Sequence, residues 1–284
     1  MTVDDRPATH CAGERATDRP PRYVVKLGSA CLRHGSVFAE VAALVTGGAR
    51  VLLVAGGAEG VREHYTRIGR TVRTVRLRNG DTVRYVPPDE VPHLVDAYTS
   101  VTLPRVRRAL AGHGLTVHAA TACTDRLVEA APMGPLRVVE EGRQRIVRDH
   151  RAGTVVAVDG ARLDALLDDH DVVCLCPPVA ATDDGTPLNV DADVLAAHLA
   201  LAVAADHLRL VTGTAGVLAD PERPDSTVPD LRIGEGMGYA RGRMRQKVRA
   251  AELAVTGVAD VVVTGPHTLA IAGGTRFRPA PPAE

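Results

Sequence analysis

Five short apolar segments, each followed by a glycine or a proline, constrain the fold of this chain more than any other feature. They are Tyr23–Leu27, Val51–Ala55, Val172–Cys176, Leu208–Thr212 and Val261–Thr264. Helical patterns lie among them, for example over 36–45, 59–68 and 244–255. Buried apolar strands that alternate with helices favour a parallel sheet covered on both faces. We therefore predict an α/β fold, a three-layer α/β/α sandwich with a mainly parallel central sheet.

Two further segments indicate β-hairpins inserted on the substrate side of that sheet. The first covers residues 72–86 and turns at Asn79-Gly80-Asp81. An Asn-Gly pair between two alternating runs is a strong hairpin signal. The second covers residues 136–148 and turns at Glu140-Glu141-Gly142.

The sequence divides into one folded domain and two flanking segments. Residues 1–21 are polar and lack the apolar stretch of a signal peptide, so we expect a disordered extension and a cytoplasmic protein. Residues 22–275 form the domain, and the proline-rich residues 276–284 are expected to fray. No apolar run reaches about 18 residues, so no membrane span is predicted.

Charge and cysteine content argue against several functional classes. Basic and acidic residues number 34 each, and aromatic residues make up only 2% of the chain. A neutral chain with so few stacking side chains is a poor candidate for binding nucleic acid. The five cysteines include no CxxC pair, so we expect reduced thiols and no zinc site.

Two lysines and an acidic segment suggest a chemistry. Lys26 lies in the first apolar segment, Lys247 lies on the last predicted helix, and Asp191 and Asp193 lie between them. Catalysis of phosphoryl transfer is largely positioning plus positive charge, which two lysines held by one carboxylate would supply. The acidic pair has an equally good structural interpretation, because aspartate often caps a helix.

Glycine-rich turns follow the first two apolar segments. Gly28 and Ser29 come soon after Lys26, and Gly56 and Gly57 open a predicted helix. Glycine lets the backbone approach a phosphate, and amides at the start of a helix point toward an anion. Neither turn has the spacing of a P-loop or of a dinucleotide-binding motif, so each alone also describes an ordinary turn.

The order of these motifs resembles the amino acid kinase family over roughly residues 22–268. Within it, the chain is most similar to the acetylglutamate kinases, and among those to the carrier-protein-linked aminoadipate and glutamate kinases. The matching blocks are Val25–Gly28, Leu53–Glu59, Val83-Arg84, Arg151–Val155, Pro177-Pro178, Leu188–Asp193, Thr214–Leu218 and Gly242–Lys247. The resemblance implies an acceptor-substrate half over 22–175 and an ATP half over 176–275.

The resemblance also implies a role for each matched residue. Lys26 and Lys247 would contact the transferred phosphoryl group, and Asp193 would hold both lysines. Phosphate would meet the backbone amides of Gly28, Ser29, Gly56 and Gly57, and the acceptor would meet Arg84, Asn189, Gly57 and Ala58. ATP would be held by Thr212, Gly213, Gly216, Val217, Leu218, Arg243 and Met244. Mg²⁺ would bind through water and nucleotide oxygens, so no protein ligand to a metal is expected.

Five arginines in and beside the predicted hairpins need an explanation, and we name them the carrier rim: Arg73, Arg76, Arg78, Arg143 and Arg145. Their structural interpretation is protection of sheet edges by charge. Their functional interpretation is docking of a small acidic carrier protein that bears the substrate, which would speed association at low salt.

The predicted function is ATP-dependent phosphorylation of the side-chain carboxylate of an acidic amino acid, giving an acyl phosphate. The acceptor would be of the aminoadipate or glutamate type, on the C-terminus of an amino-group carrier protein in lysine or arginine biosynthesis. The family usually has glycine at Ser29 and histidine at Ala55, which suggests a specialised pathway. The alternatives are an acetylglutamate kinase and a non-catalytic nucleotide-sensing regulator. Such kinases are commonly oligomeric, and a homodimer is expected.

Overall fold

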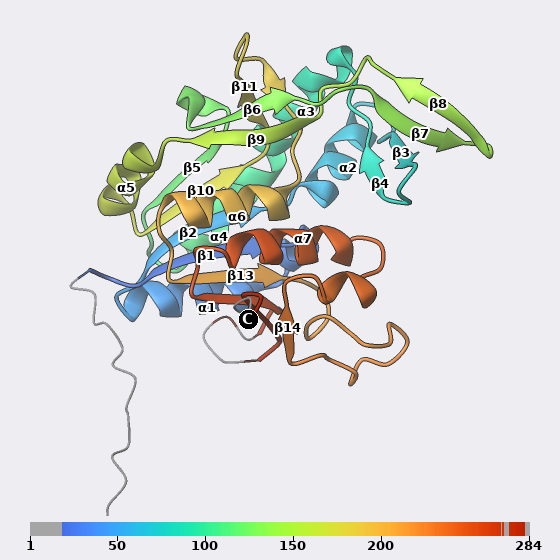
Figure 1. Ribbon diagram of the computed structural model, residues 1–284. Coiled ribbons are helices and arrows are strands. Elements are labelled where there is room, and N and C mark those ends of the chain that lie inside the picture. The colour runs from blue at the N-terminus through green and yellow to red at the C-terminus, as the bar shows by residue number, and fades with distance from the viewer. Residues whose placement is uncertain (1–18, 268, 270–272, 282–284) are drawn as a thin grey trace, which may run out of the picture.

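The computed structural model describes residues 19–267, 269 and 273–281. They form a central eight-stranded sheet with helices packed on it (Figure 1). The strand order is β14-β16-β15-β13-β1-β2-β10-β5. Every neighbouring pair is parallel except β15 and β16. The predicted mainly parallel sheet is confirmed. Its strands are β1 (Arg22–Leu27), β2 (Arg50–Ala55), β5 (Val117–Thr121), β10 (Val172–Cys176), β13 (His207–Val211), β14 (Asp230–Arg232), β15 (Asp260–Thr264) and β16 (Thr275–Arg278).

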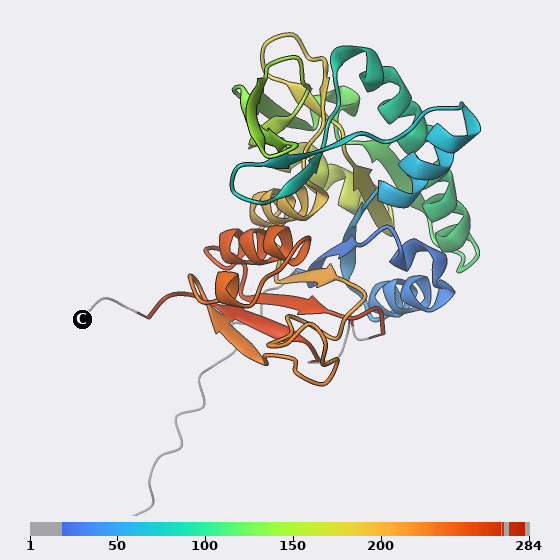
Figure 2. The same ribbon diagram turned by 90° about the vertical axis from the view of Figure 1, so that its right-hand side faces the viewer.

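Helices cover both faces of the sheet, which confirms the three layers. One apolar core lies against α5 (Gly160–Asp169), α6 (Ala192–Ala202) and α7 (Met244–Ala254). A second core lies against α1 (Gly35–Thr46), α2 (Ala58–Arg67), α3 (Val91–Ala97) and α4 (Leu103–Ala111). Figure 2 shows the gold and orange-red helices α6 and α7 across the sheet from the blue α1. Shorter helical turns are η1 (Cys31–Arg33), η2 (Pro88–Glu90), η3 (Tyr98–Thr102), η4 (Thr124–Arg126) and η5 (Gly236–Gly238).

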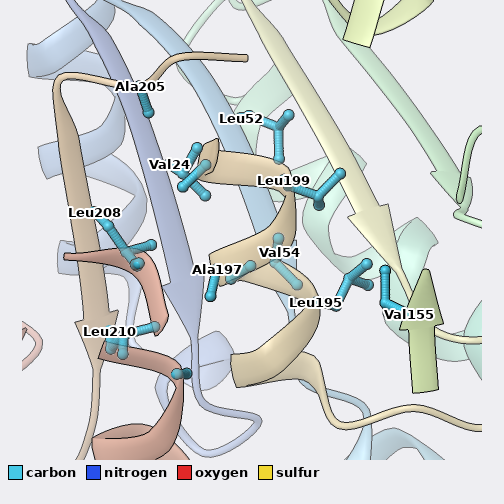
Figure 3. Close-up of a cluster of buried hydrophobic side chains, with 14 of the residues drawn as sticks. Val24, Leu52, Val54, Val155, Leu195, Ala197, Leu199, Ala205, Leu208 and Leu210 are labelled. Carbon is cyan, nitrogen blue, oxygen red and sulfur yellow. The ribbon is translucent and has the colours of Figure 1, made fainter. Parts of the chain in front are cut away.

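Alternation along the strands explains how both cores are filled. Val24 and Leu52 lie in the core beneath α6, whereas Val25 and Leu53 lie in the opposite core. Figure 3 shows Leu199 of α6 above the strands that carry Val24 and Leu52. All five side chains are fully buried, and burying each one contributes roughly 1.5–3 kcal/mol. Among the described helices, none is long and apolar enough to cross a membrane.

Two smaller sheets lie beside the central one. The order of the first is β12-β11-β6-β9. The second, β4-β3-β7-β8, joins the two predicted hairpins, because β3 pairs with β7 through Arg76–Val139 and Leu77–Val138. The strands are β3 (Thr74–Leu77), β4 (Thr82–Arg84), β6 (Val128–Pro132), β7 (Leu136–Glu140), β8 (Arg143–Val147), β9 (Gly153–Val158), β11 (Val179–Ala181) and β12 (Pro187–Leu188).

The predicted frayed tail over 276–284 is wrong for residues 276–278. These residues belong to β16, which lies between β14 and β15 inside the central sheet. Phe277 is 1% exposed and packs in the core beneath α7. One large apolar side chain therefore anchors this strand. The neighbouring arginines and prolines remove the usual apolar pattern of a strand, which is why the sequence did not predict it. Residues 282–284 lie outside the described part of the chain.

The disorder predicted for residues 1–21 does not extend to Arg19, and residues 1–18 lie outside the described part of the chain. The Arg19 guanidinium contacts the Asp206 carboxylate at 2.9 Å and 3.1 Å, and the carbonyl oxygen of Ala204 at 2.8 Å. These bonds tie the start of β1 to the loop before β13.

Candidate active site

The carboxyl ends of three neighbouring parallel strands bring the predicted loops to one edge of the central sheet. Lys26 of β1 lies level with Val54 of β2 and with Leu210 of β13. The turns after β1, β2 and β13 therefore leave the sheet at the same edge, and Gly28 and Ser29 belong to the first of them. Ligands of α/β proteins commonly bind at such an edge.

Lys26, Asp193 and Lys247 meet in one cluster at this edge. The Nζ of Lys26 lies 3.0 Å from Oδ1 of Asp193. The Nζ of Lys247 donates to Oδ1 at 2.8 Å and to Oδ2 at 3.0 Å. Lys26 and Asp193 are 6% exposed and Lys247 is 7% exposed. Because β1, α6 and α7 supply one residue each, the cluster forms only when the sheet and these two helices are packed together.

The lysines of this cluster are also the only two in the chain, whose 34 basic residues are otherwise all arginine. The lysine count alone therefore points to these two residues, a signal in the sequence that the motif analysis did not use. A lysine ammonium is a compact charge that can lie between two anions, whereas a guanidinium is broad and planar. The use of lysine at these two positions alone fits a site that requires compact cations.

Burial and charge act on these three groups in opposite directions. Burial favours the neutral form of Asp193, but the two ammonium groups outweigh it and hold the pKa of the carboxyl below its usual value. Burial disfavours the charged form of Lys26, yet Asp193 and Asp191 raise its pKa. Burial and the like charge of Lys26 lower the pKa of Lys247 to about 8. Two ammonium groups thus share one carboxylate, an arrangement that attracts an anion.

Asp191 caps α6, as the structural interpretation of the acidic pair predicts. Its Oδ1 accepts from the amide of Asp193 at 2.8 Å and from that of Val194 at 3.2 Å. Burial and the nearby Asp193 raise the pKa of its carboxyl. The cap fixes the first turn of α6, from which Asp193 contacts the lysines. The two interpretations of the acidic pair therefore apply to different residues.

The turn after β2 joins the turn after β1 through a backbone hydrogen bond. The amide of Gly56 donates to the carbonyl oxygen of Leu27 at 2.9 Å. Gly57 is the N-cap of α2, and its carbonyl oxygen accepts from Val61 at 2.8 Å. Amides in the first turn of a helix, here beginning with Ala58, have no acceptor within the helix. These amides are the anion-binding donors that the turn can offer.

Tyr98 is a residue of this region that the sequence did not reveal. It lies in the π-helical turn η3 and is 3% exposed. A Cβ placed on Gly57 would lie 2.3 Å from its ring, so this packing requires glycine. Burial raises the pKa of the Tyr98 phenol, and the nearby Arg84 guanidinium partly opposes that shift. Tyr98 therefore brings the predicted acceptor-binding arginine next to the turn after β2.

Asn189 is held at the site by its backbone. Its amide donates to the carbonyl oxygen of Arg151 at 2.7 Å, and its carbonyl oxygen accepts from the amide of Gly153 at 3.0 Å. These bonds join the segment before α6 to the start of β9. They hold the backbone of Asn189 in place just before Asp191, the N-cap of α6.

Thr275 of β16 fastens the loop predicted to hold ATP. The amide of Val217 donates to the Thr275 hydroxyl at 2.8 Å, and this hydroxyl donates to the carbonyl oxygen of Val228 at 2.6 Å. A Cβ on Gly216 would lie 2.7 Å from the same hydroxyl. Val217 and Leu218 are buried. Sequence reasoning missed Thr275 because it did not recognise β16.

The other predicted ATP-binding residues lie beside this loop and at the start of α7. Thr212 donates its amide to the carbonyl oxygen of Thr264 at 2.8 Å. Gly213 has open space where a side chain would lie. Arg243 is the exposed N-cap of α7, and Met244 is the first residue of that helix. The edge thus offers buried cations, helix-start amides and a second loop, an arrangement that fits a phosphorylated ligand.

Comparisons with known proteins identify the family. A family model described as the amino acid kinase family matches residues 21–265. A putative LysW-aminoadipate/LysW-glutamate kinase from Aeropyrum pernix is 32% identical, over 82% of this chain and 87% of its own length. An acetylglutamate kinase from Synechococcus sp. (strain CC9605) is 28% identical, over 87% of this chain and 84% of its own length.

Solved structures share the fold. A protein from Streptococcus mutans UA159 superposes with a TM-score of 0.72 at 19% identity, covering 90% of this chain and 98% of its own. A carbamate kinase from Giardia lamblia bound to AMP-PNP gives a TM-score of 0.61 at 16% identity, covering 92% and 99%. The kinase names of the sequence relatives support an ATP-dependent carboxylate kinase, and the chain belongs to the amino acid kinase family.

Proposed function

We propose that this chain transfers the γ-phosphoryl group of ATP to the side-chain carboxylate of an acidic amino acid carried on the C-terminus of an amino-group carrier protein. The acceptor is of the aminoadipate or glutamate type. The observation that carries the proposal is the buried cluster of Lys26, Asp193 and Lys247, because two cations held by one carboxylate favour transfer of an anionic group.

In this reaction an oxygen of the acceptor carboxylate attacks the γ-phosphorus. The bond from that phosphorus to the bridging oxygen breaks, ADP leaves with the electron pair, and an acyl phosphate forms. No proton is removed from the acceptor, because its carboxylate is already ionised at neutral pH. Lys26 and Lys247 stabilise the charge on the phosphoryl oxygens from opposite ends, and Asp193 keeps both ammonium groups in place.

ATP lies on the side of the cluster formed by the loop after β13 and the start of α7. Mg²⁺ neutralises charge on its phosphates when bound. The two nearby carboxylates are already engaged, Asp191 by helix amides and Asp193 by the lysines. This engagement supports an ion held by nucleotide oxygens and water.

The acceptor binds between the turn after β2 and strand β4. Arg84 is half-buried there, and a guanidinium suits bidentate binding of an α-carboxylate. Gly57, Ala58 and Asn189 contact the remainder of the acceptor. The names of the aminoadipate and glutamate kinase relatives support an acceptor of this class.

The exposed arginines of the carrier rim do not all share one face of the sheet β4-β3-β7-β8. Residues directly opposite one another on neighbouring strands project to the same face. Arg76 lies opposite Thr82, on the face that also carries Arg84. Arg145 lies opposite Val138, which lies opposite Leu77, and therefore projects to the other face. A carrier that delivers its substrate to Arg84 contacts Arg76 more directly than Arg145.

We expect Arg76→Glu to raise the KM for carrier-bound substrate on the order of tenfold at low salt, because reversing a charge at a docking surface slows association. The KM for ATP, which is proposed to bind on the other side of the cluster, should stay unchanged. Steady-state kinetics at two salt concentrations measures both. Arg108→Glu, at an exposed position on α4, is the matched control. Equal changes in the KM for carrier-bound substrate in Arg76→Glu and Arg108→Glu would assign Arg76 to the structural interpretation of the rim.

An ATP-dependent hydroxamate assay, which traps acyl phosphates, tests the function itself. N-acetylglutamate is compared with glutamate or aminoadipate attached to the C-terminus of an acidic carrier protein. Signal with the carrier alone supports the proposal. Signal with free N-acetylglutamate favours the second candidate, an acetylglutamate kinase, which relatives such as the Synechococcus enzyme support by name. Nucleotide binding without signal for any acceptor would instead favour a nucleotide-sensing regulator.

A further inference from the structure

The turn of the β3–β4 hairpin contacts α7, the helix that carries Lys247. Oδ1 of Asp81 lies 2.9 Å from Nε of Arg245, and Oδ2 lies 2.7 Å from Nη1 of Arg249. The side-chain amide of Asn79 donates to Oδ2 at 3.0 Å. Figure 2 shows the teal hairpin reaching down to the orange-red helix α7. A turn predicted only to reverse the chain therefore makes a contact between the two predicted halves of the molecule.

Asp81 is enclosed in this contact. Its side chain is 5% exposed, whereas those of Arg245 and Arg249 are 32% and 36% exposed. A carboxylate removed from water needs charged or hydrogen-bonding partners. Each oxygen of Asp81 faces one guanidinium, so the carboxylate keeps a charged partner on both sides while the hairpin is docked.

The turn itself is built to present this carboxylate. The amide of Asp81 donates to the side-chain oxygen of Asn79 at 3.0 Å. The amide of Leu77 donates to the carbonyl oxygen of Asp81 at 2.7 Å. Gly80 has a φ of +85°, a left-handed conformation that glycine adopts readily.

The contact joins two segments that carry proposed site residues. Arg245 and Arg249 are four residues apart, so they lie on one face of α7. Lys247 lies between them in sequence and contacts Asp193 instead. On the hairpin, Arg84 follows Asp81 by three residues in β4. In the part of the chain that the structure describes, the ion pairs of Asp81 are the ones that link this hairpin to α7.

We propose that Asp81 is a positioning residue that couples the acceptor side of the site to its phosphate side. Docking of Asp81 onto Arg245 and Arg249 sets the position of Arg84 relative to Lys247. The inference rests on the proposed function for the roles of those two residues. Because coupling between two sites is reciprocal, nucleotide bound beside the start of α7 also stabilises the docked hairpin.

Hydrogen exchange tests the coupling without any acceptor. In the wild-type protein, Mg²⁺ and ADP should slow amide exchange across residues 74–84, and in Asp81→Asn they should not. Asp230→Asn is the matched control, since Asp230 pairs with Arg278 at 2.8 Å away from the hairpin. Equal protection of the hairpin in the wild type and in Asp81→Asn would overturn the proposal. So would a wild-type hairpin whose exchange does not respond to ADP.

Kinetics separates positioning from local folding of the hairpin. With the acceptor that gives a signal in the hydroxamate assay, Asp81→Asn should lower kcat about tenfold to a hundredfold, because small misplacements of a reacting group are costly. Its Kd for ADP should rise, because a hairpin that nucleotide stabilises must in turn favour nucleotide binding, and Asp81→Glu should recover part of both losses. An unchanged kcat in Asp81→Asn would show that the contact only holds the hairpin on α7 and does not position the reacting groups. A wild-type protein inactive with every acceptor would contradict the proposed function, while the exchange measurement still decides the coupling.

Discussion

Asp193→Asn should lower kcat by roughly 10³-fold and destabilise the protein by about 3–5 kcal/mol. The substitution removes the one carboxylate that contacts both buried ammonium groups. Without it, Lys26 and Lys247 repel each other and no longer have fixed positions at the phosphoryl group. The hydroxamate assay measures the loss of activity, and urea denaturation measures the loss of stability.

Asp164→Asn provides the comparison for this substitution. Asp164 pairs with Arg22 at 2.9 Å, and its side chain is 42% exposed. The Asp164 side chain stays partly open to water, so losing this single pair should cost about 1 kcal/mol or less and leave activity unchanged. If Asp193→Asn behaved like Asp164→Asn, the cluster would have no role in catalysis.

Lys247→Met should lower kcat about 10²–10³-fold with little loss of stability. Methionine fills most of the same space, and its uncharged side chain ends the repulsion with Lys26. Asp193 keeps Lys26 as its partner at 3.0 Å, so no buried carboxylate is left unpaired. Activity and thermal denaturation, measured side by side, distinguish this outcome from that of Asp193→Asn. A large loss of stability would show that Lys247 is needed for folding.

The low pKa of Lys247 predicts that activity depends on pH near neutrality. Its pKa is lowered to about 8 by burial and by Lys26, so the ammonium loses its proton as the pH rises through that value. The protonated form binds phosphate, and kcat/KM for ATP should therefore fall above about pH 8. In Lys247→Arg the falling limb should disappear from this range, because a guanidinium keeps its proton. A limb that stays near pH 8 in that variant would belong to another group.

The sequence predicted the parts of the fold whose signal is local. The segment Val51–Ala55 is apolar at every position because both faces of β2 are buried, and it ends in glycine because the chain turns there. The assignment of Lys26, Asp193 and Lys247 to one site came from the order of their motifs, which resembles that of the amino acid kinase family. The distances between them come from the packing of β1, α6 and α7 and could not be read from the sequence.

The residues that escaped prediction act through partners distant in sequence. Tyr98 is an ordinary apolar position of a helix until its ring meets Gly57. Thr275 fastens the ATP loop from a short strand whose other residues include two arginines. Asp81 looks like a common turn residue, and only the packing of the hairpin on α7 reveals its two guanidinium partners. No local pattern encodes such contacts.

The burial of both lysines has a chemical consequence for an enzyme that makes an acyl phosphate. Such products are acylating agents, and an exposed, unprotonated side-chain amine is a natural target for them. This chain has two lysines, and both are at most 7% exposed. Every other basic residue is an arginine, whose guanidinium stays protonated and is a poor nucleophile. An enzyme with this surface offers its own product no exposed lysine to modify, so repeated turnover should produce little acyl-lysine on it.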